Sequence, residues 1–73
     1  MKKTIYDDDY KVFVRKLKKA RSESGLTQVQ AAKKLGSTQA YISKVESGQL
    51  RVDVSQLKKF ASMYGKNVTY FLK

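Results

Sequence analysis

The chain has 73 residues, and its 16 Lys and Arg side chains against six Asp and Glu give a formal net charge of +10. This length allows one small domain, and a hydrophobic share of 41% suffices for a modest core. Cysteine and histidine are absent from the sequence, which excludes disulfides, thiolate metal sites and histidine-based catalysis.

Residues 1–9 are expected to form an N-terminal arm ahead of a single domain over residues 10–73. The pattern leaves open whether the first six residues, MKKTIY, are an arm or an edge strand. The Asp run at 7–9 can cap a first helix, because carboxylates suit the positive end of a helix dipole. The inner face of this helix, which should end near Gly25, follows at helical spacing: Tyr10, Phe13, Val14, Leu17 and Ala20.

Four shorter helices are predicted after the first. Thr27 is a good N-cap for a second helix to about Leu35, and Ser37 or Thr38 caps a third to about Ser47. Asp53 opens a fourth helix with a capping-box spacing, and Asn67 opens a short last one. The inner faces of these last two helices are predicted to hold Val54, Leu57, Phe60, Ala61 and Tyr64, then Val68, Phe71 and Leu72. Left-handed caps are predicted at Gly25, Gly36, Gly48 and Gly65.

The segment 27–48 combines two short helical patterns with a tight turn at Gly36. Ala32 is small where two helices must touch, and Ile42 and Val45 are branched on the inner side of the second one. Each of these residues alone is weak evidence, but the whole set in this order is typical of a DNA-reading helix-turn-helix. Residues 10–73 carry fourteen basic against three acidic side chains, which points to a polyanion as the partner.

The chain resembles the lambda-repressor-like, XRE-type helix-turn-helix regulators. The resemblance is carried by this segment and extends over about residues 10–72. It implies an all-α, compact five-helix fold in which the second and third helices form the motif, usually dimeric on operator DNA. Ala31, Ser37 and Val52 stand where the family often has Leu, Val and Pro, and the first two should thin the core around the motif. The matching motifs are Leu26-Thr27-Gln28, Ala32-Lys33-Lys34-Leu35-Gly36 and Tyr41-Ile42-Ser43-Lys44-Val45-Glu46-Ser47-Gly48.

The outer face of the third helix is the candidate base-reading surface. Gln39, Ala40, Ser43 and Lys44 have the spacing of one helical stripe, which the resemblance places in the major groove. There, Gln39 could pair with adenine, Ala40 could meet a thymine methyl, and Lys44 could reach guanine or a phosphate. The alternative is an ordinary solvated polar face.

Contacts to the DNA backbone are expected from residues flanking the motif, and an internal ion pair from two others. The resemblance implies that Arg21 and Glu46 pair structurally rather than touch DNA. Tyr41 either presents its hydroxyl to a phosphate, which we favour, or packs its ring against the second helix. The expected backbone contacts are Thr27, Gln28, Thr38, Tyr41, Gln49 and Arg51.

The proposed role is a sequence-specific regulator, a repressor or controller, that binds a near-palindromic operator in double-stranded DNA as a homodimer. Tyr70, Phe71 and Leu72 are the candidate dimer interface, although Phe71 could instead pack inside. The alternatives are an antitoxin, whose toxin would need a surface such as residues 1–9, and a protein-interaction module that has kept the fold. No 18-residue apolar window or signal peptide occurs, so we expect a cytoplasmic protein. No metal, cofactor, membrane contact or enzymatic activity is expected.

Overall fold

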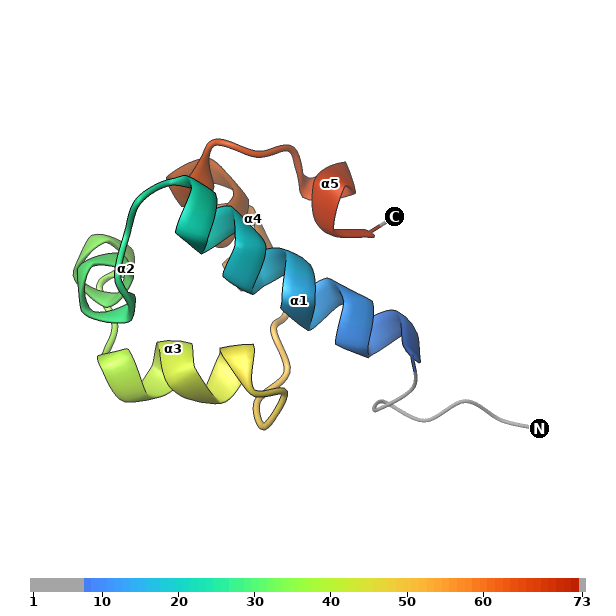
Figure 1. Cartoon of the computed structure of the whole chain (residues 1–73), viewed down its shortest axis with the longest axis horizontal. Helices are drawn as coiled ribbons and strands as arrows, with labels where there is room; N and C mark the ends of the chain where they lie inside the picture. Colours follow the sequence, from blue (N-terminus) through green and yellow to red (C-terminus); the bar gives the residue numbers. More distant parts are fainter. Residues whose placement is uncertain (1–7, 73) are drawn as a thin grey trace.

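The computed structural model describes residues 8–72, with side-chain surroundings from Tyr10 onward, and this part of the chain is all-helical (Figure 1). The five predicted helices are confirmed. Two residues assigned to the arm belong to the first helix, while the rest of the arm, including MKKTIY and Asp7, lies outside the described residues. The helices are α1 (Asp8–Glu23), α2 (Gln28–Leu35), α3 (Gln39–Glu46), α4 (Val54–Tyr64) and α5 (Val68–Leu72).

Side-chain caps define where α2 and α3 begin. Thr27 forms a capping box on α2: its Oγ1 accepts from the Gln30 backbone N–H at 3.1 Å, and its own N–H donates to Gln30 Oε1 at 2.9 Å. Thr38, rather than Ser37, caps α3 by accepting from the Tyr41 N–H at 3.1 Å. These caps satisfy N–H groups that have no partner within the helix.

The turn between α2 and α3 depends on Gly36. Its φ of +76° lies in the left-handed region, where a residue with a Cβ is strained. The Gly36 N–H donates to the carbonyls of Ala32 and Lys33, which closes the end of α2. The predicted tight turn at this glycine is therefore confirmed.

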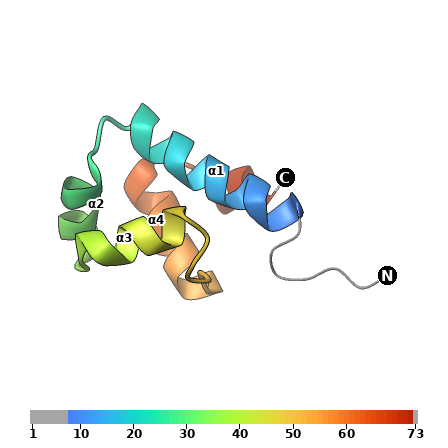
Figure 2. The same cartoon turned by 60° about the horizontal axis from the view of Figure 1, so that its bottom comes forward.

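The helices pack around one core that draws on all of them. In Figure 1, α1 runs across the molecule with α4 behind it, α2 lies at one end, and α3 runs below α1; the turned view of Figure 2 brings α3 in front of α4. Helix α2 contacts α3 and α4, and α1 contacts α3, α4 and α5. The core consists of Leu17, Ala20, Ala31, Ala32, Ile42, Val45, Leu57, Phe60, Ala61, Tyr64 and Phe71.

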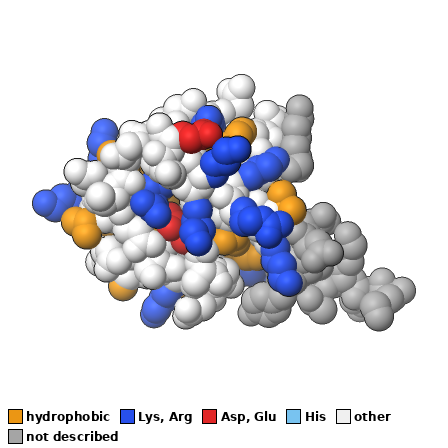
Figure 3. All heavy atoms as spheres, viewed as in Figure 1, with side chains coloured by type: hydrophobic (Ala, Val, Ile, Leu, Met, Phe, Trp, Pro, Cys, Tyr) orange, Lys and Arg blue, Asp and Glu red, His pale blue; other side chains and the backbone are white. Residues whose placement is uncertain are grey.

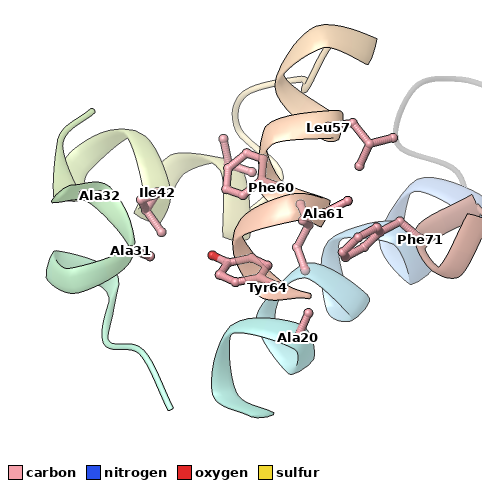
Figure 4. Close-up of a cluster of buried hydrophobic side chains, with 11 residues drawn as sticks. Ala20, Ala31, Ala32, Ile42, Leu57, Phe60, Ala61, Tyr64 and Phe71 are labelled. Atoms are coloured by element: carbon pink, nitrogen blue, oxygen red, sulfur yellow. The ribbon is translucent and has the colours of Figure 1, made fainter. Parts of the chain in front are cut away.

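The small residues of α2 lie opposite large rings from α4. Ala31 and Ala32 are both buried, and the hydroxyl end of Tyr64 points toward Ala31 in Figure 4. The Phe60 and Tyr64 rings lie 5.9 Å apart, centroid to centroid. Aromatic rings from α4 therefore line the side of the core that faces α2, where the family often has a larger residue than Ala31.

Two expectations for apolar residues were wrong. Val54, predicted on the inner face of α4, is 68% exposed, because it is the first residue of the helix and precedes the stretch that other helices cover. Leu72, predicted on the inner face of the last helix, is 65% exposed, while its neighbour Phe71 fills the core. None of the helices within residues 8–72 has the length and apolar character needed to cross a bilayer.

Candidate nucleic-acid interface

The outer face of α3 carries the predicted base-reading stripe. Ile42 and Val45 are fully buried on the inner side of the helix. Their burial determines which face of α3 points toward the core and which points toward solvent. The four stripe residues are consequently all exposed on the opposite side: Gln39, Ala40, Ser43 and Lys44. The stripe thus offers an amide, a methyl group, a hydroxyl and an ammonium, which are groups that read base edges in a major groove.

The first residue of the stripe is held by hydrogen bonds. Gln39 Nε2 donates to Gln28 Oε1 at 2.7 Å, and Gln28 Nε2 donates to Glu46 Oε1 at 3.0 Å. The Gln39 amide keeps its carbonyl oxygen and one N–H free of these bonds. One acceptor and one donor are the pair that matches adenine N6 and N7.

The hydrogen bonds that link Gln39, Gln28 and Glu46 end at an ion pair between Glu46 and Arg21. Arg21 Nε donates to Glu46 Oε2 at 2.6 Å and Arg21 Nη2 donates to Glu46 Oε1 at 3.0 Å, which makes the pair bidentate. A third donor, Arg21 Nη1, bonds the Leu26 carbonyl at 3.0 Å. The hydrogen bond to Glu46 raises the pKa of Arg21 above its ordinary value. The expected internal ion pair is therefore present, between α1 and the end of α3.

Thr27 and Thr38, at the N-termini of α2 and α3, are among the residues predicted to contact the DNA backbone. Thr27 and Thr38 are exposed, and each uses its Oγ1 as an acceptor in its cap. The hydroxyl hydrogen is not needed for the cap, so it can donate to a phosphate oxygen. Gln28, by contrast, is half-buried and its side chain already bonds two protein partners, so its backbone N–H at the helix start is the group most available to a phosphate.

The loop that follows α3 folds back on the end of that helix. The N–H groups of Gln49 and Leu50 both donate to the Lys44 carbonyl, at 2.9 and 3.3 Å. Tyr10 on α1 donates its hydroxyl to the Leu50 carbonyl at 3.0 Å, and the Arg51 guanidinium lies 5.5 Å from the centre of the Tyr10 ring. Gln49 and Arg51 are exposed, and they lie in the loop after α3, next to the start of α1.

Tyr41 was expected either to contact a phosphate with its hydroxyl or to pack its ring against the second helix. Its ring is stacked on Phe60 at a centroid distance of 6.4 Å, so it packs against α4 and not against α2 as that alternative had it. Its hydroxyl accepts a hydrogen bond from Gln56 Nε2 at 3.1 Å. The hydroxyl keeps its own hydrogen, so contact with a phosphate stays a prediction.

The predicted dimer residues fall into two groups. Phe71 is 1% exposed and packs inside its own domain, so this ring cannot form a surface for a second chain, and its assignment to the interface was wrong. Tyr70 is half-buried beneath the Lys66 ammonium, 4.7 Å from the ring centre, and Leu72 projects outward.

Two contacts of the site gave no signal in the sequence. The link from Gln28 to Glu46 joins residues 18 positions apart, and the Tyr10–Leu50 bond joins residues 40 apart. Tyr10 had been assigned only to the apolar face of α1. Within residues 8–72, no group of three or more His, Cys, Asp or Glu side chains is placed to hold a metal ion.

Comparison with known proteins agrees with this geometry. A family model described as Helix-turn-helix matches residues 17–71. The chain is also 42% identical, over 53 residues, to the glutamine–fructose-6-phosphate aminotransferase (isomerizing) of Methanocaldococcus jannaschii. That match covers 71% of this chain, but the chain spans about 5% of the length of this curated relative. The likeness is thus to a short segment of a much longer protein.

Proposed function

Because the chain belongs to the XRE/lambda-repressor-like helix-turn-helix family of DNA-binding regulators, we propose that it reads an operator sequence in double-stranded DNA through α3. Base edges would be contacted by the exposed stripe of Gln39, Ala40, Ser43 and Lys44. The caps at Thr27 and Thr38, the start of α2, and Gln49 and Arg51 would bind flanking phosphates. The protein would act in the cytoplasm as a repressor or controller.

The observation that carries this proposal is the fixed position of the Gln39 amide. Gln28 holds it at 2.7 Å, and Gln28 is in turn held by Glu46. An amide that is already oriented loses less conformational entropy when it meets a base, and this favours discrimination between bases. The network therefore favours base reading over the solvated-face alternative.

A two-fold dimer on a near-palindromic operator is the second part of the proposal. Leu72, at the end of α5, is 65% exposed, and Tyr70 of the same helix is half-buried. A second copy could cover this apolar side chain, and symmetric dimers are the commonest oligomers. Two recognition helices would then meet half-sites roughly one helical turn, about 34 Å, apart.

The test is selection of bound sequences from a random duplex pool at two salt concentrations. An enriched near-palindrome, bound less tightly at the higher salt, would support the whole proposal. Enrichment of a single half-site would retain base reading and reject the dimer. Salt-sensitive binding without enrichment would leave a non-specific DNA binder, and absence of binding would favour the protein-interaction alternative.

A further inference from the structure

We propose that the groove between α1 and the loop after α3 binds the sugar–phosphate backbone of DNA, and that Lys11 and Arg15 are its phosphate contacts. This inference rests on the proposed function, because it extends the DNA-binding surface beyond the helix-turn-helix itself. Neither residue belongs to the predicted set of contacts, which came from the motif and its flanks.

The groove has a volume of about 690 Å³ and two unlike walls. One wall is the first half of α1, with Tyr10, Lys11, Val14 and Arg15, and the other is the segment 47–49 after α3. The cations provide charge for phosphates, and the Tyr10 and Val14 side chains provide apolar surface for deoxyribose. This combination fits a nucleic-acid backbone better than a free anion, which would have no use for the apolar wall.

The groove is continuous with the proposed recognition surface. Its loop wall begins where α3 ends, and the Gln49 N–H bonds the carbonyl of Lys44 at 2.9 Å. The Tyr10 hydroxyl holds the Leu50 carbonyl at 3.0 Å, so α1 and the loop are tied together. A DNA strand lying along Gln49 and Arg51 would therefore pass beside α1.

Neither Lys11 nor Arg15 forms an ion pair with an acidic residue in the range 10–72. The three acidic residues in the range 10–72 are engaged elsewhere: Glu23 with Lys66, Glu46 with Arg21, and Asp53 as the cap of α4. Lys11 and Arg15 are exposed and four residues apart on one face of α1, and the Arg51 guanidinium lies over Tyr10. Figure 3 shows several Lys and Arg side chains over the part of the surface that α1 forms.

A second groove supplies a matched control. It also has a volume of about 690 Å³ and a basic rim, but it lies between the end of α2 and α4. Its lining does not include the loop after α3. Lys58 and Lys59 line it and are exposed. Removal of these two charges changes the net charge of the protein by the same amount as removal of Lys11 and Arg15, at a different place.

The experiment compares the wild-type chain with Lys11→Gln/Arg15→Gln and Lys58→Gln/Lys59→Gln. Affinity for the operator from the duplex selection, and for a scrambled duplex, is measured against salt concentration. Each lost phosphate contact lowers the slope of log affinity against log salt by about 0.9. The α1 variant should therefore lose about 1.8 units of slope per bound protomer on both duplexes, with an unchanged operator-to-scrambled ratio, and the control should lose much less.

A wild-type slope in the α1 variant would overturn the inference, and so would an equal loss in both variants, since that would reflect net charge alone. Circular dichroism of both variants establishes that the folds are intact. A wild-type protein that binds both duplexes equally would refute sequence-specific reading, while the slopes would still decide on the groove. Absence of any wild-type binding would reject both proposals.

Discussion

Replacing Glu46 by Ala should lower the free energy of unfolding by about 3 kcal/mol. The carboxylate is 6% exposed and accepts three hydrogen bonds, two from Arg21 and one from Gln28. Removal of one partner of a buried pair costs about 3–5 kcal/mol, because the other charge is left without compensation. The Arg21 side chain is 19% exposed, so water relieves part of this cost, and the lower end of the range applies.

An effect of this size is a large share of the roughly 5–15 kcal/mol that stabilises a small domain. Each kcal/mol shifts the Tm of such a domain by about 4–8 °C, so the Tm should fall by at least about 12 °C. Urea unfolding followed by circular dichroism would measure the difference. The control is Glu23→Ala, which removes a carboxylate from the exposed pair with Lys66 and should change stability far less.

A double-mutant cycle with Arg21→Met separates the pair from other effects. If the pair carries the stability, the loss in the double variant should be smaller than the sum of the two single losses. The reasoning would be refuted if Glu46→Ala cost no more than Glu23→Ala, or if the two single losses were additive. Either result would mean that the bidentate geometry contributes little.

Further changes test other parts of the structure. Gln39→Ala should relax base preference at one position, at about 1–3 kcal/mol for that base, and selection from the duplex pool would show no change if the stripe is misassigned. Arg51→Ala should weaken binding to all duplexes alike and lower the salt slope by about one unit per bound protomer, and an unchanged slope would remove Arg51 from the contacts. Burial raises the pKa of Tyr64 from 10.0 to about 12. The unfolded chain therefore loses this proton first, and unfolding free energy should fall as pH rises from 10 to 12. That part of the fall should be absent in Tyr64→Phe, measured by urea unfolding across this range, and at pH 7 the variant should be no less stable, since the hydroxyl has no hydrogen-bond partner among the described residues. Gly36→Ala should cost about 1 kcal/mol in thermal unfolding because of the positive φ, and a neutral result would contradict the strain.

Local signals predicted the helices well because they act within a few residues. Caps such as Thr27 and Asp53 bond the backbone three residues later, so their effect is visible in the sequence itself. The outward direction of the α3 stripe was equally predictable, since Ile42 and Val45 fix the opposite face. The sequence did not indicate whether Ser37 or Thr38 is the N-cap of α3, because both residue types can cap a helix and the geometry of the turn selects one.

Contacts between distant segments could not be predicted in the same way. The exposure of Val54 depends on where the neighbouring helices stop covering α4, which periodicity does not encode. The bond from Tyr10 to Leu50 and the link from Gln28 to Glu46 require the tertiary fold first. The family resemblance indicated the ion pair of Arg21 and Glu46 but not its connection to Gln28.

Within the α3 stripe, one side chain is held by hydrogen bonds and three are not, and this difference bears on changes of base preference. Gln39 is hydrogen-bonded to Gln28, which is bonded in turn to Glu46 of the ion pair with Arg21. A new residue at 39 would leave Gln28 without this partner, so it calls for a matching change at 28. Ala40, Ser43 and Lys44 are exposed and carry no side-chain hydrogen bond within the described residues. If α3 reads an operator as proposed, these three positions can be changed, by selection or by engineering, without loss of a side-chain hydrogen bond of the domain.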